Sequence, residues 1–157
     1  MSQAAQFIEA IKGSPDLNCY FTTIYELRSN PDHKQVRNFP TYNVVDNIDE
    51  LKRLNDGDHG IFIAINDIRE GSTTRLAKDV TNVRALFVDV DDGRPIPDEW
   101  NLERSVVVRT SKVGDQTKWQ AFWIVDDCAV DAFTNAQSQL ISFYGSDEAP
   151  KDPSRLM

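Results

Sequence analysis

The chain has 157 residues, 40% of them hydrophobic and 27% charged, a length and composition typical of one globular domain. The sequence has no apolar run long enough to span a membrane and no signal-peptide pattern. It has too few cysteines for a disulfide framework and too few histidines for a histidine-rich metal site. These features predict a protein of the reducing cytoplasm. The net charge of −8 excludes a surface that binds nucleic acid over the whole molecule, so any such contact has to be local.

The N-terminal part combines one helical and one extended pattern. Residues 3–12 are expected to form a short helix, and residues 18–26, rich in β-branched and aromatic side chains, are expected to form a strand. Residues 28–43 contain two prolines and many polar groups, which predicts a loop.

The middle of the chain begins with a second helix, which Asp46 or Asn47 caps and Gly57 closes. Residues 60–66 are nearly all apolar, as expected for a strand that is buried on both faces. A polar stretch follows over residues 67–82.

The C-terminal half contains three further strand candidates, at residues 84–91, 105–110 and 118–125. A polar loop joins the last two, so we expect a hairpin there. Residues 129–144 have apolar side chains at helical spacing, which predicts a helix that ends at Gly145.

This order of elements predicts an α/β (α+β) domain over residues 1–157, with a mixed β-sheet of about five or six strands and flanking helices. Arg155-Leu156-Met157 resembles the start of another strand. We therefore expect a single domain that is an N-terminal fragment of a larger protein.

The strongest chemical signal is a pair of aspartates that ends an apolar strand. Strand alternation points Asp89 and Asp91 to one face and the apolar residues between and before them to the other. Their backbones would lie roughly 6 to 7 Å apart, so both carboxylates can bind one or two hard divalent cations. The alternative is that these aspartates only begin a turn, and Asp92-Gly93 is typical of one. A turn does not explain Asp89, which interrupts an apolar run.

A second signal lies in the last strand candidate, where Lys118 and Gln120 begin an otherwise apolar face. They indicate a site where this strand emerges beside the aspartates, although an amphipathic hairpin alone would give the same pattern. Basic residues that can bind a triphosphate or a template backbone, or lie on the surface as solvated charges, are Arg75, Lys78, Arg84, Arg109, Lys112, Lys118 and Arg155.

The order of these motifs resembles that of archaeo-eukaryotic-type primases, and specifically the RepB-like and prim-pol domains of plasmids, phages and integrated elements. The resemblance covers roughly residues 55–157. It rests on the segments 60–66, 84–91, 109–112 with 118–123, and 152–156.

The resemblance implies an RRM-like primase catalytic core in which Asp89 and Asp91 hold Mg²⁺ or Mn²⁺. A third acidic residue, Asp147 or Asp152, would complete the catalytic metal site. The residues expected to contact the incoming nucleotide are Ser111, Lys118, Gln120 (where histidine is common) and Arg155. The residues expected to contact nucleic acid are Arg75, Lys78, Arg109 and Lys112.

The implied function is that of a DNA primase or primase-polymerase domain. It would use nucleoside triphosphates and a single-stranded DNA template to make primers for a mobile element, with a fused or associated helicase. One alternative is an inactive replication-initiator or nucleic-acid-binding module on the same fold. Another is a haloacid-dehalogenase-like phosphatase, whose motif needs a small hydroxyl residue where Arg94-Pro95 follows Gly93 here.

Overall fold

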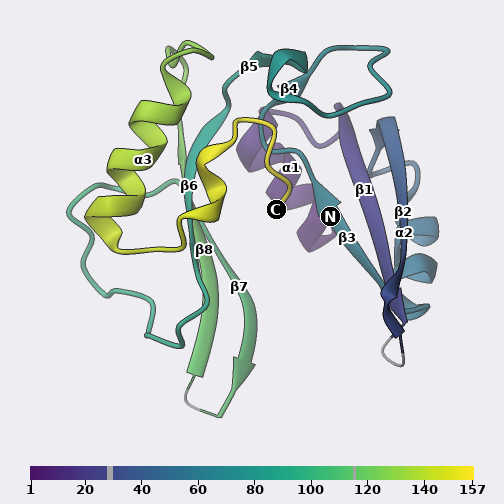
Figure 1. Cartoon of the computed structure of the whole chain (residues 1–157), viewed down its shortest axis with the longest axis horizontal. Helices are drawn as coiled ribbons and strands as arrows, with labels where there is room; N and C mark the ends of the chain where they lie inside the picture. The colour runs from purple at the N-terminus through teal and green to yellow at the C-terminus, as the bar shows by residue number, and fades with distance from the viewer. Residues whose placement is uncertain (28–29, 115) are drawn as a thin grey trace.

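Two three-stranded antiparallel sheets form the frame of the domain (Figure 1). The computed structural model describes residues 1–27, 30–114 and 116–157. The first sheet has the order β2-β1-β3, with strands β1 Asn18–Leu27, β2 Asn30–Asn43 and β3 His59–Ile63. The second has the order β6-β8-β7, with strands β6 Ala85–Val90, β7 Val106–Val113 and β8 Gln116–Ile124.

Strand β2 corrects the sequence prediction, because residues 30–43 are extended and paired with β1 where a loop was expected. Residues 28 and 29 of the expected loop lie outside the described residues. β2 is an edge strand, which tolerates proline because one of its edges needs no ladder hydrogen bonds. The pairing shifts where Phe21 faces Phe39 and Cys19 faces Tyr42, so β2 accommodates Pro40 at an irregular position.

The three predicted helices are present. They are α1 Gln3–Lys12, α2 Ile48–Asp56 and α3 Phe133–Tyr144, so α3 begins later than the pattern of residues 129–144 predicts. Asn47 precedes α2, but its side chain makes no capping hydrogen bond. Gly57 follows α2, and Gly145 ends α3 in the left-handed conformation that favours glycine.

The segment between β3 and β6 contains more structure than its polar sequence indicates. Strand β4, Asp67–Ile68, pairs with β5, Val80–Asn82, and a short 3₁₀ turn, η1, Ala77–Asp79, precedes β5. The strand expected over residues 60–66 is only half-buried up to Phe62 and fully buried beyond it.

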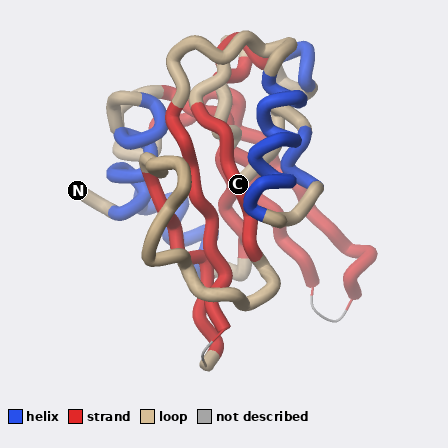
Figure 2. The backbone as a smooth tube through the Cα atoms, turned by 90° about the vertical axis from the view of Figure 1, so that its left-hand side faces the viewer, coloured by secondary structure: helices blue, strands red, loops and turns tan. Residues whose placement is uncertain are grey.

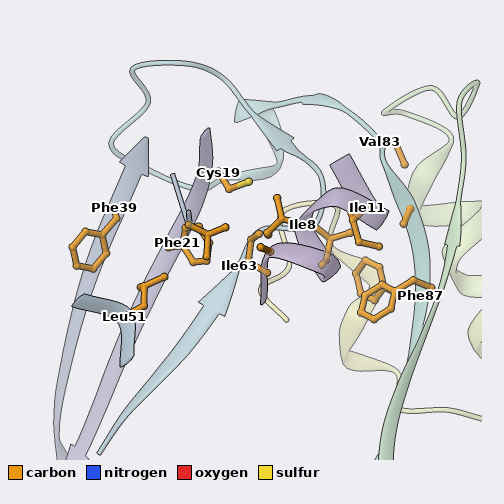
Figure 3. Packing of buried hydrophobic residues seen from close by; sticks show 14 of the residues in the cluster. Ile8, Ile11, Cys19, Phe21, Phe39, Leu51, Ile63, Val83 and Phe87 are labelled. Carbon is orange, nitrogen blue, oxygen red and sulfur yellow. The ribbon is translucent and has the colours of Figure 1, made fainter. Parts of the chain in front are cut away.

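The main hydrophobic core lies between the two sheets, with α1 inside it. Ile8 and Ile11 of α1 lie between Phe21 and Ile63 of the first sheet and Phe87 of the second (Figure 3). A smaller cluster on the opposite face of the second sheet contains Val88, Val90, Trp119, Trp123 and Leu140. Most apolar residues of β6 and β8 are therefore buried, on both faces of that sheet, whereas Ile124 at the end of β8 is exposed.

The two hairpins β1–β2 and β7–β8 extend toward the same end of the molecule (Figure 2). The C-terminal residues pair with the end of β3. Leu156 forms a β-bridge with Ala64, and Met157 and Ile63 exchange two backbone hydrogen bonds of 2.9 Å. The extended segment expected at residues 155–157 is thus paired at the end of β3.

The α+β class is confirmed, with the strands divided among three antiparallel sheets instead of joined in one. None of the helices in the described part of the chain is long and apolar enough to cross a membrane.

The outer edge of β6 is covered by a side chain of α3. Gln137 is fully buried, its Oε1 accepts from the backbone N–H of Phe87 at 3.1 Å, and its Nε2 donates to the carbonyl of the same residue. One amide side chain therefore takes the place of a further strand at this edge.

Replacing Gln137 with leucine is expected to lower the free energy of unfolding by about 2 to 3 kcal/mol, because two buried backbone groups of Phe87 lose their partners. Urea denaturation measures this loss. Gln139→Leu, at an exposed position of the same helix, is the matched control. Equal effects of the two substitutions would contradict the assigned role of Gln137.

Candidate active site

The register of β6 and β8 brings the first predicted side chains together. Asp89 of β6 lies directly opposite Gln120 of β8, and Gln120 Nε2 lies 3.4 Å from Asp89 Oδ1. The same face carries the Phe87–Phe122 pair, which is fully buried in the main core. Asp89 and Gln120 therefore lie on the core-facing side of the sheet, where its apolar residues give way to polar ones.

Asp91 follows directly after the end of β6 and is exposed. Lys118 Nζ lies 3.5 Å from Asp91 Oδ1, in an ion pair whose side chains are both about half exposed. Ser111 of β7 faces Lys118 across the hairpin. Five predicted site residues thus gather at the ends of three neighbouring strands.

Asp147 lies beside Asp89 because the chain after α3 runs along the free edge of β6. The Asp147 N–H donates to the Asp89 carbonyl at 3.1 Å. Arg94 fixes this path, since its guanidinium donates to the carbonyls of Tyr144 and Gly145 at 2.9 and 2.6 Å. Arg94 was not predicted as a site residue from the sequence. A cation beside the last carbonyls of a helix is a known stabilising contact, but the sequence does not show that Arg94 meets the end of α3.

The pKa of Asp89 is raised above its ordinary value. Burial is the largest cause, followed by the charge of Asp91; the charge of Asp147 adds to them. The hydrogen bond from Gln120 and the charge of Arg155 act in the opposite direction without cancelling the rise. Asp89 thus sits in a site with excess negative charge, which a bound cation would stabilise.

Two arginines lie near the C-terminal segment, and one of them, Arg155, acts on the charge of Asp89. Arg75, half-buried before η1, donates from its guanidinium to the Ser154 carbonyl. Burial is the main cause that lowers the pKa of Arg75. The charge of Asp152 raises this pKa and the charge of Arg155 lowers it, so Arg75, Asp152 and Arg155 are neighbours. The Nε of Arg155 is buried and has no hydrogen-bond partner within residues 1–27, 30–114 and 116–157, and the charge of Arg155 acts on Asp89.

Asp152 is placed differently from Asp147. Its Oδ1 accepts from both the backbone N–H and the hydroxyl of Ser154 at 2.8 Å, so it shapes the turn into the last strand segment. Its charge acts on Arg75, whereas the acids that act on Asp89 are Asp91 and Asp147.

In the described part of the chain, the other predicted basic residues make no hydrogen bond or ion pair with the aspartate pair. Arg109 faces Trp119, which puts it on the opposite face of the second sheet from Asp89. Lys78 is exposed on η1, where its charge acts on Asp79. The side chain of Lys112 lies outside the described residues.

A cavity of about 660 Å³ lies between α1, β3 and β7, and neither Asp89 nor Asp91 is among its lining residues. Most of its walls are apolar, from Phe7 of α1, Phe62 of β3 and Val108 of β7 among others. Gln120 lines the cavity and also donates to Asp89, so it joins the apolar space to the acidic pair.

The donors of the acidic pair fit a hard divalent cation, because they are carboxylates that repel each other in a partly buried site. Within residues 1–27, 30–114 and 116–157, no group of three or more histidine, cysteine, aspartate or glutamate side chains is close enough to hold a metal ion. The protein therefore offers a two-carboxylate site with a third acid nearby, not a preassembled cage.

A scan against protein-family models found no match, and a search of curated proteins found none. A search of solved structures found the AEP (archaeo-eukaryotic primase) domain of the primase-polymerase of cyanophage S-2L. The two structures superpose with a TM-score of 0.67, over 99% of this chain and 78% of that one, at 18% sequence identity. The chain has the fold of an archaeo-eukaryotic primase domain.

The primase-type fold implied by the order of the sequence motifs is thus confirmed. An identity of 18% carries the fold and not the activity. The narrower RepB-like assignment stays a prediction, and so do the roles of the individual site residues.

Proposed function

We propose that this chain is the catalytic domain of a primase-polymerase, which transfers nucleotides from nucleoside triphosphates to a growing strand on a single-stranded DNA template. One observation carries the proposal: Asp89 and Asp91, with Asp147 beside them, lie next to Gln120 and Lys118. They do so on a fold shared with a primase-polymerase domain.

Asp89 and Asp91 are the residues that would hold Mg²⁺ or Mn²⁺, and we assign Asp147 as the third acid. The backbone hydrogen bond from Asp147 to Asp89 and the effect of its charge on the pKa of Asp89 support this choice over Asp152. When bound, such ions neutralise the triphosphate, activate the attacking hydroxyl and stabilise the departing pyrophosphate.

The cations around the pair suit a triphosphate. Lys118 forms an ion pair with Asp91, and the charge of Arg155, whose buried Nε finds no hydrogen-bond partner among the described residues, acts on Asp89. Arg75, whose charge interacts with that of Arg155, adds a second guanidinium. Arginine binds phosphate through paired donors and lysine as a point charge, so together they can orient the triphosphate over the acids.

Gln120 has a positioning role in this proposal. Its amide holds the Asp89 carboxylate from across the β6–β8 ladder and keeps it aimed out of the sheet. An amide carries out this task without a charge of its own, so it does not weaken the attraction of the acids for a cation.

Three narrower predictions rest on the order of the sequence motifs alone and stay predictions. They are membership of the RepB-like branch, primer synthesis for a mobile element, and a helicase partner. The fold similarity favours the primase reading over a dehalogenase-like phosphatase. An inactive nucleic-acid-binding module on the same fold is favoured by one observation, namely that the described residues contain no three-ligand metal cluster.

The experiment that tests the proposal incubates the chain with Mn²⁺, labelled nucleoside triphosphates and single-stranded DNA. We expect dinucleotides or extended primers that form only when metal is present. Template binding without any metal-dependent triphosphate binding would contradict the proposal and establish the inactive module instead.

A further inference from the structure

Asn66, shortly after the end of β3, has a polar side chain that is enclosed in the protein. The residue is 1% exposed, and its amide bonds to backbone groups of two segments that lie far along the chain. Its Oδ1 accepts from the N–H groups of Arg84 and Ala85 at 2.9 and 3.4 Å. Its Nδ2 donates to the Pro153 carbonyl at 2.9 Å. This side chain therefore joins the start of β6 to the C-terminal segment.

Both of the joined segments lead to the candidate active site. β6 begins at Ala85 and carries Asp89 four residues further on. Arg155 follows Pro153 by two residues, and its charge acts on Asp89. Figure 1 shows the C-terminal segment passing from α3 beside β6 to the end of β3. The place of Arg155 relative to Asp89 thus depends on how this segment is fixed to β6.

The backbone on both sides of Arg155 is held in place. Before it, Asn66 donates to the Pro153 carbonyl. The guanidinium of Arg75 donates to the next carbonyl, that of Ser154. After it, the C-terminal residues pair with the end of β3. In the ranges that the structure describes, the buried Nε of Arg155 has no acceptor, so a fixed backbone presents an unused cationic donor.

We propose that Asn66 is a positioning residue of the triphosphate site, because its amide fixes the backbone that carries Arg155 to the strand that carries Asp89. This role rests on the proposed function, in which Arg155 helps to bind the triphosphate over the acids. An amide suits the task, since it accepts from one segment and donates to the other without adding a buried charge. Asn66 contacts neither the triphosphate nor the metal ion, so its whole effect on binding passes through Arg155.

The test is a double-mutant cycle on the binding of a Mn²⁺-bound, non-hydrolysable nucleoside triphosphate, measured by calorimetry. Arg155→Met should weaken binding about tenfold or more, the scale of one lost hydrogen bond to a charged group. Asn66→Ala should also weaken binding, because the guanidinium is still present but no longer fixed. In the double variant the loss should be no larger than that of Arg155→Met alone, since Asn66 then has no group left to position.

Asn66→Asp supplies a second variant, which decides the question if Asn66→Ala does not fold. The carboxylate keeps the acceptor for the two N–H groups at the start of β6 and loses the donor to Pro153. It should therefore weaken triphosphate binding in the wild-type background and have no further effect in the Arg155→Met background. Thermal unfolding of each variant verifies that it is folded.

Asn43→Ala is the matched control, because Asn43 makes the same pattern of hydrogen bonds at the end of β2. Its Nδ2 donates to the Asp16 carbonyl, and its Oδ1 accepts from the N–H groups of Val45 and Asp46. The variant loses a comparable set of bonds away from β6 and the C-terminal segment. It should lower the thermal stability and leave the triphosphate affinity unchanged.

The outcomes separate the two proposals. Losses that add in the double variants, or an Asn66→Asp variant that binds the triphosphate as tightly as the wild type, would overturn the positioning role and leave the proposed function standing. Failure of both Asn66 variants to fold would make the residue a purely structural one and would overturn the positioning role as well. Absence of metal-dependent triphosphate binding by the wild-type chain would overturn the proposed function itself.

Discussion

Replacing Asp89 or Asp91 with asparagine is expected to reduce metal-dependent nucleotide incorporation by at least about a hundredfold, the scale on which loss of one charge-stabilising group at a reacting centre acts. Asparagine keeps the shape of the side chain and removes the charge that a divalent cation needs. Labelled-nucleotide incorporation in the presence of Mn²⁺ measures the effect. Asp98→Asn, at an exposed position of the loop before β7, should retain wild-type activity.

The same Asp89→Asn variant excludes unfolding as the cause of the loss. The raised pKa of Asp89 means that burial and neighbouring acids disfavour its charge in the folded protein. Removing the charge should leave the metal-free protein at least as stable as the wild type by thermal unfolding. An active Asp89→Asn variant would contradict the assigned catalytic role, and a variant less stable than the wild type would contradict the expected effect on stability.

Asp67→Ala is expected to lower the free energy of unfolding by about 3 kcal/mol or more, because it leaves a buried lysine without its partner. Lys12 of α1 has a side chain only 4% exposed, and its Nζ lies 2.9 Å from Asp67 Oδ1. Arg84, just before β6, pairs with the other oxygen at 2.6 Å. This cluster therefore connects α1, β4 and the start of the catalytic strand, and its loss should loosen the contact between the two sheets.

Urea denaturation measures this effect. Asp49→Ala is the matched control, because Asp49 pairs with Lys52 at 3.8 Å on the exposed face of α2 and should contribute about 0.5 kcal/mol or less. The double variant Lys12→Met, Asp67→Leu should recover much of the stability, since it removes both buried charges. A loss of under 1 kcal/mol for Asp67→Ala would contradict the assigned role of the pair.

The same pair gives a pH dependence whose sign follows from the pKa of Asp67. Burial alone would raise that pKa, but Lys12 and Arg84 more than offset burial and hold it below the ordinary value of 3.8. The stabilisation is thus present above the ordinary value and is lost as the pH falls through the lowered one. The wild type should lose more stability below about pH 4 than the double variant.

Local sequence signals were sufficient for most of the fold and for the centre of the site. Strand alternation puts Asp89 and Asp91 on one face, and the β6–β8 register then sets Gln120 opposite Asp89. β2 was missed because its prolines argue against a strand unless the strand is known to lie at an edge, and an edge is a property of the sheet.

The remaining residues act through contacts that local patterns do not encode. The sequence indicates only a polar helix position for Gln137, yet its amide forms hydrogen bonds with the backbone of Phe87 at the edge of β6. Arg94 reads as a turn residue, yet it fixes the path that puts Asp147 beside Asp89. The choice between Asp147 and Asp152 depends on how the chain turns after α3, so the sequence left both open.

The most direct test of the metal-binding centre is anomalous diffraction from crystals of the chain grown with Mn²⁺ and a non-hydrolysable nucleoside triphosphate. We expect an anomalous peak about 2.1 Å from carboxylate oxygens of both Asp89 and Asp91. The triphosphate should bind the same ion. A nucleotide bound elsewhere, or a manganese ion that contacts neither aspartate, would contradict the assignment of this pair as the catalytic centre.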